Sequence, residues 1–215
     1  MKHQFGNKIY IPVKSITVFA CILSIIAVSA FAFSNNNEVP VSKAKYEVLN
    51  KEKDSIASVQ AFMQVYTVLM SPRCMNCHPS GDRPLQGDDN HIHIMNVQRG
   101  KDGKGLYALK CSNCHQPTNV AGLHTPPGNP KWQLPPADMK MVFQGKPAHE
   151  LAVQIMDYNR NGHKNKEQLL EHARDTLVKA GWNMGEGRPA PPLAYNDFVK
   201  AWDTWIDKGG YAPSK

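Results

Sequence analysis

The stretch Cys74-Met75-Asn76-Cys77-His78 and its counterpart Cys111-Ser112-Asn113-Cys114-His115 share one local pattern in this chain of 215 residues. Each has the form C-x-x-C-H, which marks covalent attachment of haem c. Cysteines three residues apart share a helical face and can bond the two vinyl groups of one porphyrin, while the imidazole of the next residue reaches the iron. The sequence therefore predicts two covalent haems, attached through Cys74, Cys77, Cys111 and Cys114, with His78 and His115 as the proximal iron ligands.

The same four cysteines allow two other interpretations. Paired C-x-x-C units can bind one zinc ion through four thiolates, but the interval between these pairs is long for a compact zinc ribbon. A zinc site would also not require a histidine after both pairs. Disulfide bonds are the second alternative, because an exported chain meets an oxidising environment. Haem attachment explains all six residues, and it is the interpretation that we favour.

The first 34 residues have the pattern of an export segment. Lys2, Lys8 and Lys14 precede an uncharged apolar run from Ser15 to Phe33, and no acidic residue accompanies them. Small residues near the end of the run favour cleavage, but about 19 apolar residues are also enough to span a bilayer. We therefore expect a signal peptide or an N-terminal membrane anchor at 1–34. The rest of the chain is predicted to be periplasmic, either soluble or tethered to the inner membrane, so membrane association through this segment stays open.

Composition limits what the exported part can be. Residues 35–45 are polar and contain a proline, which predicts a linker, and residues 46–215 are predicted to form one dihaem cytochrome c domain. After the first 34 residues, 22 basic and 18 acidic residues remain, a formal charge of +4 that haem propionates would largely offset. The chain lacks a basic cluster with interleaved aromatic residues, so nucleic-acid binding is not expected.

Apolar periodicity predicts a mainly α fold. Residues 55–70, 149–158, 166–180 and 196–208 carry apolar side chains at helical spacing. The last of these segments places Trp202 and Trp205 on one stripe, which we expect to lie in the core. Residues 71–147 are rich in glycine and proline and predict no long helix. The expected architecture is cytochrome c-like, with short helices and long loops wrapped around two covalently bound haems.

The distal iron ligands are less clearly marked. The spare histidines and methionines include His91, His93, Met95, His124, Met139, Met141, His149, His163, His172 and Met184. The alternating segment 91–95 predicts an extended strand with His93 and Met95 on one face. His172 lies at the edge of a helical apolar stripe, and Met141 lies in a proline-rich loop. These four residues are the candidates that we favour.

The chain resembles a family of exported bacterial dihaem cytochromes, which are sometimes labelled as accessory subunits of isoquinoline 1-oxidoreductase-type molybdenum hydroxylases. The motifs that carry the resemblance are Ser71-Pro72-Arg73-Cys74 through His78-Pro79, His93 through Gly100, Cys111 through His115, Met141 through Gly145, and Leu170-Glu171-His172. It implies His93 and His172 as distal ligands, with Met95 and Met141 as substitutes. It also implies a redox partner protein, such as a molybdenum hydroxylase or another dehydrogenase.

Three functions are compatible with two haems. An electron-transfer protein needs six-coordinate iron and no substrate pocket. A dihaem enzyme of the peroxidase type would keep one coordination position open and use nearby acid–base groups, and a gas sensor would let a small ligand displace a weak distal residue. The chain has no second catalytic motif, such as a glycine-rich phosphate loop or H-E-x-x-H. We therefore expect an electron carrier rather than an enzyme.

Overall fold

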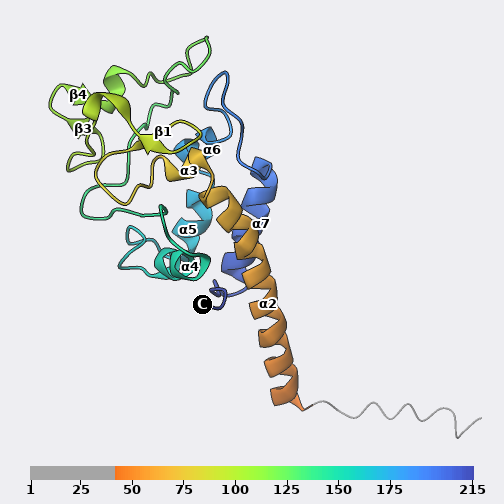
Figure 1. Ribbon diagram of the computed structural model, residues 1–215. Coiled ribbons are helices and arrows are strands. Elements are labelled where there is room, and N and C mark those ends of the chain that lie inside the picture. The colour runs from red at the N-terminus through yellow and green to blue at the C-terminus, as the bar shows by residue number, and fades with distance from the viewer. Residues whose placement is uncertain (1–41) are drawn as a thin grey trace, which may run out of the picture. The chain divides into compact units, whose positions relative to one another are not determined.

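Helices carry most of the regular structure of this chain. The computed structural model describes residues 42–215, and Figure 1 shows their arrangement. The helices are α2 (Lys43–Leu69), α3 (Pro72–Met75), α4 (Ala148–Met156), α5 (Lys166–His172), α6 (Thr176–Ala180) and α7 (Tyr195–Asp207). The prediction of a mainly α fold is confirmed at this level.

The helix boundaries differ from the predicted ones in two places. Helix α2 begins at Lys43, so the end of the predicted linker is helical, while residues 35–41 of that linker lie outside the described residues. The single helix predicted at 166–180 is two helices. Asp175 accepts a hydrogen bond from the backbone nitrogen of Leu177 (2.8 Å) and caps α6, which interrupts the helix although the apolar periodicity continues.

The apolar core lies where helices α2, α4, α5 and α7 meet. Trp202 and Trp205 of α7 are 4% and 0% exposed, as predicted, and their ring centroids are 5.4 Å apart. Phe62 of α2 packs on Trp205 at 4.6 Å. The buried indole nitrogen of Trp202 donates to the carbonyl of Leu169 in α5 (2.8 Å), so this polar atom of the core is satisfied.

Loops and very short elements fill the segment between α3 and α4, as the glycine and proline content predicts. Two small antiparallel hairpins that the sequence analysis did not anticipate occur here. They pair Leu85 with Ile92 and Gly105 with Lys110. The elements are β1 (Leu85–Gln86), β2 (His91–Ile92), η1 (Ile94–Asn96), β3 (Gly105–Leu106), β4 (Leu109–Lys110) and η2 (Cys111–Asn113).

The alternation at 91–95 does not form one extended strand, so that prediction is wrong. Strand β2 ends at Ile92, and Met95 and Asn96 follow with φ angles of 65° and 54°. These left-handed residues turn the chain, because the two-residue pairing of β2 is too short to hold the segment flat. His93 and Met95 therefore do not share the face of a strand.

Buried apolar side chains are distributed unevenly between the helices and the loops. Between residues 76 and 142 the buried apolar residues are Leu85, Cys111 and Leu134, together with Pro79 and Pro84. Nearly all the other buried apolar side chains of the described residues belong to the helical core or to Phe143 beside it. The loop segment thus has little apolar core of its own, and another source of stabilisation is needed to order it.

Among residues 42–215, no helix is both long and apolar enough to cross a membrane. The predicted signal peptide or membrane anchor at 1–34 lies outside the described residues.

Candidate haem centre

The first C-x-x-C-H motif forms a tight turn that starts on helix α3. Pro72 occupies the first turn of α3, where its missing N–H is not needed. The chain keeps turning after the helix, because Cys77 N donates to Cys74 O (3.1 Å) and His78 N donates to Met75 O (3.0 Å). The two cysteines and the histidine are therefore presented by one continuous turn, as the motif requires.

The His78 ring is held by one hydrogen bond and one stacking contact. Its Nδ1 lies 2.6 Å from the carbonyl oxygen of Met141, and its ring stacks on Phe143 with centroids 3.8 Å apart and planes 8° apart. A carbonyl oxygen can only accept, so Nδ1 carries the proton and Nε2 keeps its lone pair. The result is an imidazole of fixed orientation with a free Nε2.

Helices α2 and α4 hold the loop that supports His78. Gln154 of α4 donates to the carbonyl of Val142 (3.0 Å), and the Tyr66 hydroxyl of α2 donates to the carbonyl of Lys146 (3.0 Å). The backbone of Phe143 also donates to the carbonyl of His78 (3.0 Å). The rigid helical core thus fixes the supporting loop, and the loop fixes the histidine.

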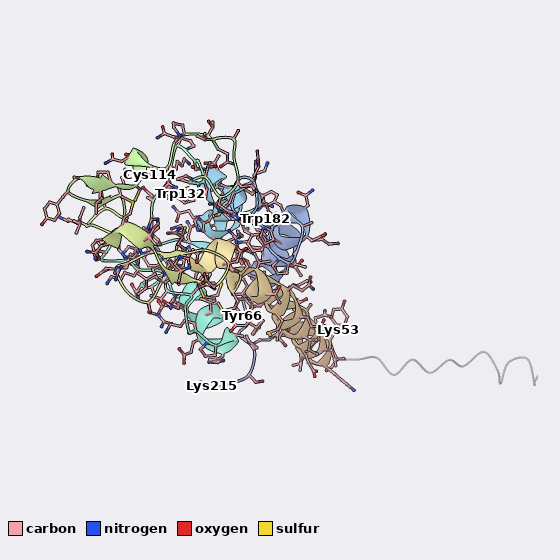
Figure 2. All side chains as sticks on the ribbon, turned by 45° about the horizontal axis from the view of Figure 1, so that its top comes forward. Lys53, Tyr66, Cys114, Trp132, Trp182 and Lys215 are labelled. Carbon is pink, nitrogen blue, oxygen red and sulfur yellow. The ribbon has the colours of Figure 1, made fainter. Side chains whose placement is uncertain are left out.

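The second motif repeats this arrangement with other residues. Its turn is the 3-10 helix η2, in which the carbonyl of Cys111 accepts from the nitrogens of Cys114 (3.2 Å) and His115 (2.9 Å). His115 Nδ1 lies 2.7 Å from the carbonyl oxygen of Pro127, and its ring stacks on Trp132 at 4.1 Å with planes 12° apart. Cys114 and Trp132, both labelled in Figure 2, mark this site. His115 therefore also has a free Nε2.

Both motif histidines are half-buried. Burial lowers the pKa of His78 to about 4 and also lowers the pKa of His115, despite the hydrogen bonds of both rings to carbonyl oxygens. The two imidazoles are therefore neutral near pH 7, which is the form that binds a metal.

His93 lies close to His115. Their ring centroids are 6.4 Å apart, with planes at 61°. Two imidazoles on opposite sides of one metal ion, each bonded at about 2 Å, have ring centroids roughly 6 Å apart. His93 Nδ1 also lies 2.7 Å from a carbonyl oxygen, that of Ile94, so its Nε2 is free as well. The separation of the two rings suits a shared iron.

His172, the last residue of α5, is near the first motif. Positive charge on His172 is one of the factors that lower the pKa of His78, after burial, so the two rings are within electrostatic range. Burial in turn lowers the pKa of His172. The structure thus brings the ring of His93 close to that of His115 and places His172 within electrostatic range of His78.

The two methionine candidates are placed differently. Met95 is 63% exposed and has the left-handed backbone described above. Met141 contributes its carbonyl oxygen to Nδ1 of His78, and its side chain packs against the apolar core. Among the other candidates, His91 and His149 have ring partners, Asp89 and the carbonyl of Pro213, each at 2.6 Å.

The cysteines do not form the alternative sites considered above. Cys74, Cys77, Cys111 and Cys114 are all free thiols. Burial raises the pKa of Cys74 to about 12 and that of Cys77 to about 11, so both are neutral thiols in the metal-free chain. Within residues 42–215, no three His, Cys, Asp or Glu side chains converge on a possible metal position. A four-cysteine zinc site is therefore absent from this part of the chain.

The aromatic and carbonyl supports of the two histidines were not identified from the sequence. Met141 and Phe143 are more than 60 residues from His78, and Pro127 and Trp132 lie in a loop without periodicity. The sequence suggested the Met141 side chain as an iron ligand, but in the structure it is the Met141 backbone carbonyl that contacts His78.

Comparisons of the chain with protein-family models, with curated proteins and with solved structures gave no match.

Proposed function

We propose that this chain is an exported dihaem c-type cytochrome that transfers electrons. The main support is that His78 and His115, each following a C-x-x-C turn, have Nδ1 held by a carbonyl oxygen and the ring stacked on an aromatic side chain. This repeated arrangement leaves both Nε2 atoms free to bind iron. The residues therefore match the donor set that covalent haem needs.

Each residue of the motifs has a defined chemical task in this proposal. Cys74 and Cys77 would hold the first haem, and Cys111 and Cys114 the second, each through thioether bonds to the two vinyl groups of one porphyrin. The Nδ1–H···O=C bonds keep His78 and His115 oriented and make Nε2 a stronger donor. Haem, when bound, supplies one-electron exchange at its iron.

An electron carrier is favoured over a peroxidase-like enzyme or a gas sensor. Those two functions need an open coordination position on at least one iron. His93, whose ring lies 6.4 Å from that of His115, and His172, within electrostatic range of His78, would provide a second nitrogen ligand for each haem. Two strong nitrogen ligands leave no position for peroxide or a gas. In this proposal Met95 and Met141 are not iron ligands.

The proposed ligand set predicts that His93→Ala opens one haem. The wild-type protein is expected to leave its reduced spectrum unchanged under carbon monoxide. His93→Ala should bind about one carbon monoxide per chain, because one of the two irons loses its sixth ligand. Absorption spectroscopy of the reduced protein checks this. His91→Ala is the matched control, because His91 is two residues away and pairs with exposed Asp89. Equal carbon monoxide binding by both variants would contradict the assignment of His93.

The proposed compartment rests on the pattern of residues 1–34, and the proposed partner rests on the family resemblance. We propose that residues 1–34 direct the chain to the periplasm, where it stays soluble or tethered to the inner membrane. The electron donor is proposed to be a periplasmic dehydrogenase or hydroxylase.

A further inference from the structure

Arg99 is a buried cation next to the first C-x-x-C-H motif. Its side chain is 1% exposed, and its guanidinium group makes three hydrogen bonds. Nη2 donates to the carbonyl of Gly81 (2.9 Å), Nη1 to the carbonyl of Pro135 (2.6 Å) and Nε to Oδ1 of Asp82 (3.3 Å). Gly81 and Asp82 follow His78 closely in the chain, so the guanidinium is tied to the loop that leaves the first motif.

The main chain of Arg99 connects this loop to the second motif. Arg99 N donates to Asp82 O (2.7 Å), and Arg99 O accepts from Gly105 N (2.9 Å). The neighbouring Lys104 O accepts from Cys111 N (3.0 Å). Arg99 thus lies on a short hydrogen-bonded path between the two haem-attachment turns.

The positive charge of Arg99 is poorly neutralised toward the protein interior. Its carboxylate partner Asp82 is 53% exposed and also pairs with Lys140 (2.7 Å), so water and a second cation share that negative charge. The guanidinium group of Arg99 is bonded to Gly81 and Asp82, which lie three and four residues after His78. The link from Arg99 to the second motif runs through main-chain atoms, from Arg99 O to Gly105 N and from Lys104 O to Cys111 N. The charged group is therefore held against the loop that leaves the first motif.

We propose that Arg99 is a positioning residue that raises the reduction potential of the first haem, the one attached through Cys74 and Cys77, more than that of the second. This inference rests on the proposed function. A ferrous haem carries one positive charge less than a ferric haem, so a nearby buried cation favours the reduced form. The fork of hydrogen bonds holds the charge in place, which a flexible lysine would do less well.

The test is a redox titration of the holoprotein followed at two wavelengths, with haem content measured separately. Arg99→Gln removes the charge and keeps polar contacts. At a fixed solution potential, this variant is expected to raise the ferric-to-ferrous ratio of the first haem about tenfold. That change corresponds to a fall of about 59 mV in its one-electron reduction potential, and the potential of the second haem should change much less. Arg99→Lys should leave the reduction potential of the first haem close to the wild-type value, because it keeps the positive charge. Lys104→Gln is the control, since it removes an exposed charge from the same segment.

The outcomes separate this inference from the proposed function. Unchanged potentials in Arg99→Gln, with two haems still attached, would overturn the role of Arg99 and leave the cytochrome proposal intact. Equal shifts in Arg99→Gln and Arg99→Lys would show a structural effect alone and would also overturn it. If Arg99→Gln does not fold, Asp82→Asn decides the question. Removing that partner anion should raise the potential of the same haem, and a potential that stays unchanged or falls would overturn the proposal.

Discussion

Replacing Cys111 and Cys114 together with alanine is expected to lower the covalent haem content from two per chain to one. Each C-x-x-C-H turn has its own carbonyl and aromatic support, so in the proposed function loss of the second pair should leave the first attachment site intact. Haem absorbance in alkaline pyridine and the intact mass of the chain measure the content. Ser112→Ala is the matched control, because it changes the same turn without removing a cysteine, and it should keep two haems. A double variant that still carries two covalent haems would contradict the attachment residues.

The single-haem variant also tests the pairing of the histidines. In the Cys111→Ala/Cys114→Ala background, His172→Ala should open the remaining haem to carbon monoxide, whereas His93→Ala should not. The expectation follows from the association of His172 with His78 and of His93 with His115. The reverse result would show that the two distal ligands are exchanged between the sites.

Without haem, the loop segment 76–142 is expected to lose its ordered structure while the helical core remains. The loops bury Leu85, Cys111 and Leu134 and few other apolar side chains, whereas Phe62, Trp202 and Trp205 anchor a continuous core between the helices. Amide hydrogen exchange of protein in which all four motif cysteines are alanine measures this. Protection in the loops should fall by about a hundredfold or more relative to the holoprotein, and α7 should change far less.

Two results would contradict this expectation. A haem-free protein with protected loops would show that they order without the cofactor. Loss of protection in α2 and α7 to the same degree would show that core and loops unfold as one unit. The holoprotein, measured under the same conditions, is the control.

Sequence patterns predicted structural features correctly where a single physical requirement produces the pattern. The C-x-x-C-H motifs indicated which six residues form the two turns, and the apolar stripe of α7 predicted the burial of Trp202 and Trp205. His93 and His172 were among the predicted distal residues, and the structure brings each near a different motif histidine. The extended strand predicted for 91–95 failed because β2 ends at Ile92 and the chain turns at Met95.

What the sequence could not provide depends on contacts between distant segments. The carbonyl of Met141 contacts His78 in a loop that Tyr66 of α2 and Gln154 of α4 also hold by hydrogen bonds. The break at Asp175 was also missed, since a capping side chain interrupted a helix whose apolar periodicity continued. No local pattern encodes such long-range contacts, and they determine how the candidate site is built.

The most direct test of the central claim is the absorption spectrum of purified protein, recorded oxidised, reduced with dithionite, and reduced under carbon monoxide, with haem quantified per chain. The proposed function predicts two covalent low-spin haems per chain whose reduced spectrum does not change with carbon monoxide. A high-spin or carbon-monoxide-binding haem in the wild-type protein would contradict the carrier assignment. The absence of haem after expression with a competent maturation system would contradict the cytochrome assignment altogether.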